Sequence, residues 1–160
     1  MKLLSKLWQF VNKDLTGREE VLESSHPYFG KVIFFGRKGY RGYWEAELAH
    51  PDLTKKFSVL IPTGKDGAME PYANFTSSLL KDLDGLFARC KPEFMFEYQK
   101  WSNEPFPPDW RRSFVLDGIT LPEETDEIEE WSVCYFVEPA NHYFTAVFQG
   151  GKVREVIVDG

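Results

Sequence analysis

The segment "WSVCYFVEPANHYFTAVFQGGKVREVIVD", Trp131 to Asp159, decides the fold class of this chain. It contains three runs rich in β-branched and aromatic residues, at 131–139, 142–149 and 152–159, and such runs are typical of β-strands. A Gly-Gly pair separates the last two runs, which is a strong signal for a two-residue hairpin turn. We therefore expect three antiparallel strands at this end of the chain.

A second group of strands is indicated by "KVIFFGRKGYRGYWEAEL", residues 31–48. A short apolar run at 31–35 leads into a segment of glycine and basic residues, and residues 43–49 then alternate between polar and apolar side chains. A third run, "KKFSVLIPT" at 55–63, follows the turn-forming "HPDL". Together these runs predict a three-stranded antiparallel meander.

The glycines of the second group could belong either to a phosphate-binding loop or to a hairpin. Gly36, Gly39 and Gly42 are spaced GxxGxxG, whereas a dinucleotide site needs GxGxxG between a strand and a helix. Here a strand follows, so no helix N-terminus is present to hold a phosphate. We interpret the glycines as residues that allow positive φ angles in a hairpin loop.

Two helices are predicted. From Pro71 onward apolar residues recur at intervals of three and four, which is typical of a helix packed on a core. Pro92 is expected to break or kink this helix, which resumes until about Trp101. Residues 3–15 form an amphipathic pattern that predicts an N-terminal helix, for which we consider packing on the core of the domain or binding to a membrane surface or a partner.

The order of these elements predicts a single α+β domain over residues 1–160. We expect an antiparallel sheet of about six to seven strands, arranged as a meander, a helix and a second meander, with "SFVLDGITL" at 113–121 as one strand or two short ones. The N-terminal amphipathic helix and the long broken helix are expected to pack on one face of the sheet.

The charge of the chain excludes some classes of function. The net charge is −6, which argues against a general nucleic-acid-binding protein. Residues 1–44 carry a balance of +4 and the remainder a balance of −10. No window is apolar enough for a membrane span, and the N-terminus lacks a small-residue cleavage site. Two cysteines outside any CxxC motif predict reduced thiols and a cytoplasmic location.

Charged segments provide the first candidate binding residues. The hairpin loop carries Arg37, Lys38 and Arg41, which could contact an acidic group. The run "EETDEIEE" at 123–130 lacks the glycine and the alternating carboxylates of a calcium loop. It is either a solvated loop or an acidic patch for a basic protein partner; the candidate residues are Glu123, Glu124, Asp126 and Glu127.

Aromatic residues provide the second set of candidates. Phe106 and Trp110 lie in the proline-rich connector "SNEPFPPDWRR", which is either a recognition loop or a lid over the sheet edge. An aromatic pocket between sheet and helices, if present, would be lined by Trp44, Tyr98, Trp101 and Trp110. Such a pocket would favour a small-molecule-binding protein or an enzyme.

No catalytic set, metal site or cofactor site is predicted. The three histidines lie in turn contexts without the spacing of metal ligands. Cys134 and His142 could face each other across a hairpin, but no third group that would orient the imidazole is apparent in the sequence. We therefore expect neither a cofactor nor enzymatic activity.

The pattern "HPYFG", a hairpin with "YWEAEL", the strand "FSVLIP" and a long helix resembles a group of small bacterial α+β domains of the immunity-protein kind. The resemblance covers residues 26–101, with Pro27, Gly30, Trp44 and Glu45 at the matching positions. It implies a protein that binds and neutralises a toxin. Together with the acidic charge, it predicts a cytoplasmic protein-binding domain with a basic protein partner.

Overall fold

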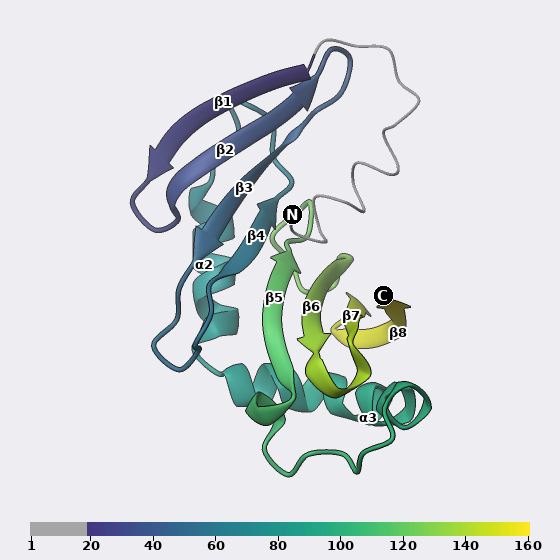
Figure 1. Cartoon of the computed structure of the whole chain (residues 1–160). Coiled ribbons are helices and arrows are strands. Elements are labelled where there is room, and N and C mark those ends of the chain that lie inside the picture. Colours follow the sequence, from purple (N-terminus) through teal and green to yellow (C-terminus); the bar gives the residue numbers. More distant parts are fainter. Residues whose placement is uncertain (1–18) are drawn as a thin grey trace.

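The strands of this protein form one sheet in which spatial order follows chain order from β1 to β8 (Figure 1). The computed structural model describes residues 19–160. The strands are β1 Glu19–His26, β2 Gly30–Arg37, β3 Tyr43–Leu48, β4 Phe57–Ile61, β5 Phe114–Thr120, β6 Trp131–Val137, β7 His142–Gln149 and β8 Lys152–Asp159. The helices are α2 Glu70–Leu80 and α3 Leu83–Trp101, with short 3-10 turns η1 Trp110–Arg112 and η2 Glu138–Ala140.

The sheet is mixed, which corrects the prediction of an antiparallel sheet. Strands β1 to β4 and strands β5 to β8 are two antiparallel meanders, and β4 pairs with β5 in parallel. Parallel neighbours need a crossover connection, which α2 and α3 provide here. The sequence indicates the strands and the helices between them, but pairing between the two meanders depends on contacts far apart in the chain.

The sheet has eight strands rather than six to seven, because β1 was not predicted. Its sequence, "EEVLESSH", is mostly polar and lacks the alternation that marks a half-buried strand. β1 lies at the edge of the sheet and pairs only with β2, from Glu19 opposite Arg37 to His26 opposite Gly30. An edge strand buries little apolar surface, so its sequence carries a weak signal.

The predicted long helix is two helices, and they separate at Lys81 and Asp82 rather than at Pro92. The Asp82 carboxylate accepts a hydrogen bond of 2.7 Å from the Gly85 amide, which caps α3 at its N-terminus. Pro92 lies within α3 at an exposed position. The prediction was wrong here because Phe94 and Tyr98, which follow Pro92, are buried in the core, and their packing keeps the chain helical despite the hydrogen bond that the proline removes.

The two glycine-rich turns confirm what the sequence indicated. Gly150 and Gly151 link β7 to β8 with φ angles of 61° and 74°, as expected for a two-residue hairpin. Gly39 and Gly42 have φ angles of 88° and 75°, which places them in a hairpin loop between two strands. Gly36 differs from the prediction, because it lies within β2 and has no positive φ angle. The segment is therefore not a phosphate-binding loop.

Both helices cover the same face of the sheet, which we call the helix face. In Figure 1, α2 lies behind β3 and β4. One core of buried side chains joins α2 and α3 to residues from all of the strands β2 to β7, such as Phe57, Val59 and Ile61 of β4. Its centre is aromatic: Phe94 of α3 lies between the rings of Phe114, at 5.6 Å, and Phe144, at 5.9 Å.

The amphipathic helix predicted over residues 3–15 lies outside the described residues. Within residues 19–160, no helix combines the length and the apolar character that crossing a membrane would require.

Candidate functional site

The loop between β5 and β6 carries the densest charge in the described structure. We call residues 123–130 the acidic loop; all eight are exposed, and six have carboxylate side chains. Three arginines from distant parts of the chain pair with it: Arg41 with Glu123 at 3.8 Å, Arg89 with Glu127 at 3.4 Å and Arg154 with Glu130 at 2.6 Å. Half of the carboxylates therefore have no arginine partner among residues 19–160.

The uncompensated part of the acidic loop surrounds an apolar side chain. Glu124 and Glu129 make no ion pair within residues 19–160, and Asp126 accepts a hydrogen bond from the Ile128 amide at 3.0 Å. Ile128 is 67% exposed, the largest fraction among the exposed large hydrophobic residues of the described chain. A single exposed isoleucine among carboxylates combines an apolar contact with a negative field.

Hydrogen bonds at both ends hold the acidic loop in place. The Gly150 amide donates to the Ile128 carbonyl at 2.9 Å, and the Gly151 amide donates to the Glu127 carbonyl at 3.1 Å. On the other side, the Tyr72 hydroxyl of α2 donates to the Glu123 carbonyl at 2.6 Å. The loop is thus fixed between the β7–β8 turn and α2, so its carboxylates are presented in a defined arrangement.

Arg89 of α3 is the main side-chain support of the acidic loop. Its guanidinium lies over the rings of Phe148, at 4.7 Å, and Trp131, at 5.4 Å, which are stacked on each other. It also donates to the Gly151 carbonyl at 3.1 Å. The sequence did not single out Arg89 or Tyr72, because their partners lie 38 to 62 positions away.

A groove of about 610 Å³ runs between α2 and the acidic loop. One wall consists of Pro71, Asn74, Phe75 and Ser78 of α2, and the other consists of Thr125, Asp126 and Glu127. Phe75 packs edge-on against the Trp131 ring at 5.9 Å. The groove therefore has an apolar side and an acidic side, next to the exposed Ile128.

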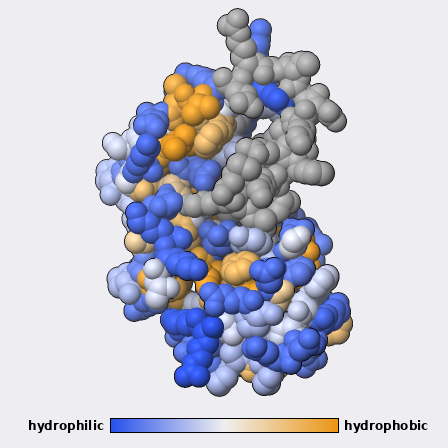
Figure 2. All heavy atoms as spheres, in the orientation of Figure 1, coloured by the Kyte–Doolittle hydropathy of each residue, from blue (hydrophilic) through white to orange (hydrophobic). Residues whose placement is uncertain are grey.

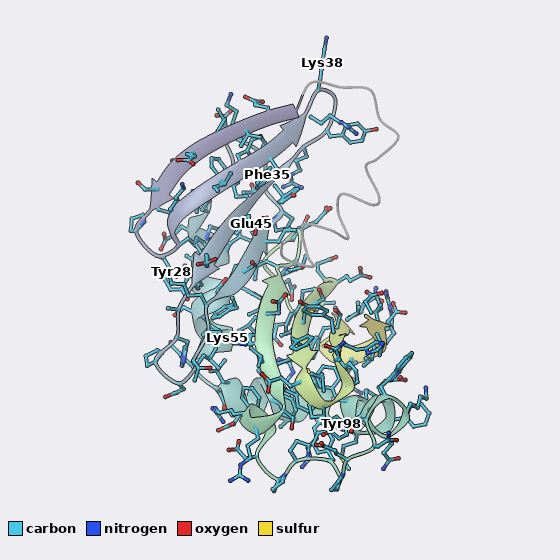
Figure 3. All side chains as sticks on the ribbon, in the orientation of Figure 1. Tyr28, Phe35, Lys38, Glu45, Lys55 and Tyr98 are labelled. Atoms are coloured by element: carbon cyan, nitrogen blue, oxygen red, sulfur yellow. The ribbon has the colours of Figure 1, made fainter. Side chains whose placement is uncertain are left out.

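The basic hairpin loop lies at the tip of β2 and β3, where Figure 3 shows Lys38 projecting away from the sheet. Arg37 ends β2, and Arg41 reaches the first carboxylate of the acidic loop. The structure thus brings together two segments that the sequence suggested separately, by a contact within the chain. Arg41 offsets part of the acidic charge at that end.

The aromatic candidates do not form a common pocket. Trp44, Tyr98 and Trp110 are buried in the core, and Trp101 is 46% exposed at the end of α3, where its ring contacts His142 at 4.6 Å. Phe106 is half-buried and packs on Tyr98 at 5.3 Å. All of them except Trp101 fill the space between sheet and helices, and none of the five lines the groove beside the acidic loop.

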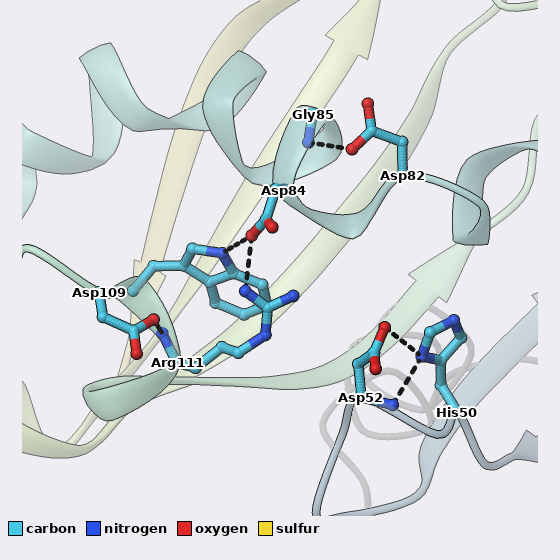
Figure 4. A network of polar contacts seen from close by, with 8 residues as sticks. His50, Asp52, Asp82, Asp84, Gly85, Asp109 and Arg111 are labelled. Carbon is cyan, nitrogen blue, oxygen red and sulfur yellow. Dashed lines mark hydrogen bonds and ion pairs between the residues drawn. The ribbon is translucent and has the colours of Figure 1, made fainter.

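Trp110 takes part in a group of contacts that joins the proline-rich connector to α3 (Figure 4). Its ring stacks on Phe87 at 4.8 Å, and its indole nitrogen donates to Asp84 at 2.7 Å. Arg111 donates to the same carboxylate oxygen at 2.6 Å. Hydrogen bonds from Trp110 and Arg111 lower the pKa of Asp84, so this carboxylate ties the proline-rich connector to the start of α3.

Cys134 and His142 do not face each other. Cys134 lies opposite Thr145, whereas His142 lies opposite Val137, and the His142 Nδ1 atom is 2.7 Å from the Ala140 carbonyl oxygen. Across residues 19–160, no three side chains from His, Cys, Asp and Glu lie close enough to hold a metal ion.

The two thiols lead to a prediction about pH. Burial raises the pKa of Cys90 and of Cys134 from an ordinary value of 9.0 to about 12. Above pH 9 an unfolded thiol loses its proton while the folded thiol keeps it, so rising pH favours unfolding. We expect the free energy of unfolding to fall by about 1 kcal/mol per thiol between pH 9 and 10, measured by urea denaturation.

The control for this measurement is the double variant Cys90→Ala/Cys134→Ala. Its stability at pH 9 differs from that of the parent because two side chains are shortened, so only the change between the two pH values is compared. We expect a smaller fall in the variant. An equal fall in both proteins would show that other groups cause the pH dependence.

Comparison with known proteins gives no match: neither a family model nor a curated protein nor a solved structure is significantly similar to the chain. The resemblance of residues 26–101 to immunity-type domains therefore stays a prediction. The functional conclusion rests on the acidic loop and the groove beside it.

Proposed function

We propose that this protein is a protein-binding domain of the immunity type, which neutralises a basic toxin by binding it with the acidic loop. The observation that carries the proposal is the fixed loop with an exposed isoleucine among carboxylates that have no ion pair within residues 19–160. Two free cysteines agree with a reducing compartment such as the cytoplasm.

The chemistry of the loop suits a basic protein surface. Carboxylates that are fixed before binding attract lysine and arginine side chains over several ångströms, which raises the rate of association. Ile128 supplies the apolar contact that charge alone lacks, since interfaces have an apolar centre and a polar rim. The groove beside α2 could receive an apolar side chain of the partner against Phe75 while Asp126 and Glu127 contact its basic neighbours.

The proposal is tested with the full-length chain as bait and the protein products of the genes adjacent to its own as prey. For a product that binds, the dissociation constant is measured for the parent and for the variant Glu124→Lys/Glu129→Lys. Both glutamates lack an ion pair within the described chain, so their replacement breaks no ion pair among residues 19–160. We expect affinity to fall by at least about tenfold, because each charge now repels the basic partner.

The matched control is Glu93→Lys/Glu104→Lys, which changes the net charge equally at two exposed sites outside the loop. We expect this variant to bind almost as well as the parent. Ile128→Ala should weaken binding while the free energy of unfolding changes by less than about 0.5 kcal/mol. Equal binding by the two charge variants, or no binding by any adjacent product, would contradict the proposal.

A further inference from the structure

The sheet has a second set of buried side chains, on the face opposite the helices. Every residue of β4 is buried, although only alternate residues can point to the helix face. Four buried apolar residues of the sheet lie outside the core that joins the sheet to α2 and α3: Tyr43, Leu60, Cys134 and Val147. We call the surface to which they belong the opposite face.

The register shows that these four residues share that face. Leu60 lies beside Thr120, Thr120 beside Ser132, and Ser132 beside Val147. A neighbouring row runs from Ser58 through Gly118 and Cys134 to Thr145. Since residues opposite each other in neighbouring strands point to the same side, the two rows form a continuous band from β4 to β7.

The opposite face also extends over the first strands of the sheet. Phe35 stacks on Tyr43 with ring centres 5.5 Å apart, and Val21 lies beside Phe35 in β1. Apolar atoms gather over β1 and β2 on the side of the molecule that Figure 2 shows. Phe35 and Glu45 are labelled on this face in Figure 3.

Two carboxylates that make no ion pair among residues 19–160 lie on the same face, on the strands that flank the band, β3 and β8. Glu45 is opposite Leu60 and half-buried, and it makes no ion pair within residues 19–160; its nearest polar partner is the Ser58 hydroxyl at 3.5 Å. Asp159, opposite Tyr143, is also half-buried and has no ion pair among the described residues. A segment that carries both apolar and basic side chains would bury the apolar residues of this face and form ion pairs with the two carboxylates.

We propose that the chain's own residues 1–18 cover the opposite face. This segment carries the apolar residues Leu3, Leu4, Leu7, Trp8, Val11 and Leu15 and the basic residues Lys2, Lys6, Lys13 and Arg18. Its composition therefore matches an apolar band beside carboxylates that have no ion pair among residues 19–160. Burying its leucines and Trp8 removes apolar area from water, and this gives the contact its free energy.

The length of the segment and the position where it ends support this assignment. It joins the described chain at Glu19, at the edge of the sheet, and the band of buried residues begins three strands away. Neighbouring strands are about 4.8 Å apart, so β6 is about 24 Å from β1. Eighteen residues span about 27 Å even at the compact rise of 1.5 Å per residue. The segment can therefore reach β6 when it is compact, and β7, about 29 Å from β1, when part of it is more extended.

Hydroxyl-radical footprinting of the full-length chain tests the proposal without any substitution. Trp101, which is 46% exposed, serves as the internal reference. We expect Trp8 to be oxidised more slowly than Trp101, at both a low and a high protein concentration. Oxidation of Trp8 as fast as that of Trp101 would overturn the proposal. Protection that disappears on dilution would also overturn it, because the face would then be covered by a second copy of the chain.

The two cysteines provide a second test. Cys134 lies on the opposite face and Cys90 in the core under the helices, and both are buried. Leu7→Asp should increase the rate of alkylation of Cys134 by at least about tenfold, because it weakens the cover and makes local opening more frequent. The rate for Cys90 should stay unchanged. The matched control, Gln9→Asp, adds the same charge at a polar position of the segment and should leave both rates unchanged.

Equal Cys134 rates in Leu7→Asp and Gln9→Asp would contradict the proposal. If Leu7→Asp unfolds the whole chain, both cysteines become reactive together. The rate of Trp8 oxidation relative to Trp101 in the unsubstituted chain then decides whether the proposal holds. The proposal and the proposed function can fail independently, because neither test involves the acidic loop or a partner protein.

Discussion

Replacing Phe94 with alanine is expected to lower the free energy of unfolding by about 3–5 kcal/mol, the range for a buried phenylalanine. Phe94 of α3 is fully buried, and its ring contacts four others, at 5.6 Å to 5.9 Å: Phe87, Phe114, Tyr135 and Phe144. Its removal leaves a cavity among rigid rings that cannot close around it. Urea denaturation followed by circular dichroism measures the change.

Phe96, two residues further along α3, is the matched control. It is 61% exposed, and its main described contact is the Lys100 ammonium, 4.2 Å from the ring centre. Phe96→Ala should therefore cost less than about 1 kcal/mol. Similar losses for the two variants would mean that the aromatic centre does not hold α3 to the sheet.

The second large effect is expected for Gly42→Ala, in the loop between β2 and β3. Gly42 has a φ angle of 75°, and an added Cβ would meet the Phe34 ring and lie 2.8 Å from the Phe35 carbonyl oxygen. The Phe34 ring packs on Trp44 at 5.1 Å and cannot move freely. Backbone strain and overpacking together should lower the free energy of unfolding by about 2–5 kcal/mol.

Gly39→Ala separates the two causes. Gly39 has a φ angle of 88°, but a Cβ there would meet nothing within 4 Å. Only the strain of the left-handed backbone then remains, about 1–2 kcal/mol. Thermal denaturation gives the loss of unfolding free energy in each variant. The difference between the two losses is the cost of the clash between the added Cβ at Gly42 and the Phe34 ring. Equal losses would show that the contact with Phe34 contributes nothing.

Both predictions concern parts of the fold that support the acidic loop. α3 carries Arg89, which holds the loop against the β7–β8 turn, and the β2–β3 hairpin carries Arg41, which contacts Glu123. Loss of either element would alter how the carboxylates are presented. Binding by such variants must therefore be compared at temperatures where each remains folded.

The elements with local signals were predicted well. β2, β3, β4, β6, β7 and β8 alternate or run apolar between turn residues, and the spacing from Pro71 indicated helix. The errors occurred where the deciding interaction lies elsewhere. β1 is a strand only because β2 offers it a partner. Pro92 stays inside α3 because Phe94 and Tyr98 beyond it pack in the core, while the local hydrogen bond from the Gly85 amide to Asp82 caps the start of α3.

The candidate site was predicted in part. The carboxylates of the acidic loop and Arg41 were candidates from the sequence, but the sequence did not indicate Ile128, Arg89 or Tyr72 as parts of the site. The aromatic candidates were chosen because large rings often line pockets, yet Trp44, Tyr98 and Trp110 fill the core. Composition identifies rings and charges, whereas burial depends on what the rest of the chain places against them.

By itself, the sequence determined the local elements: where strands and helices form, which loops turn through glycine, and where negative charge accumulates. These follow from side-chain periodicity and backbone preference, which act over a few residues. Only the tertiary structure decided that β4 lies beside β5 in parallel, that three arginines offset half of the acidic loop, and that both faces of β4 are buried. Those outcomes depend on contacts between residues far apart in the chain, whose free energy appears only when the whole sheet assembles.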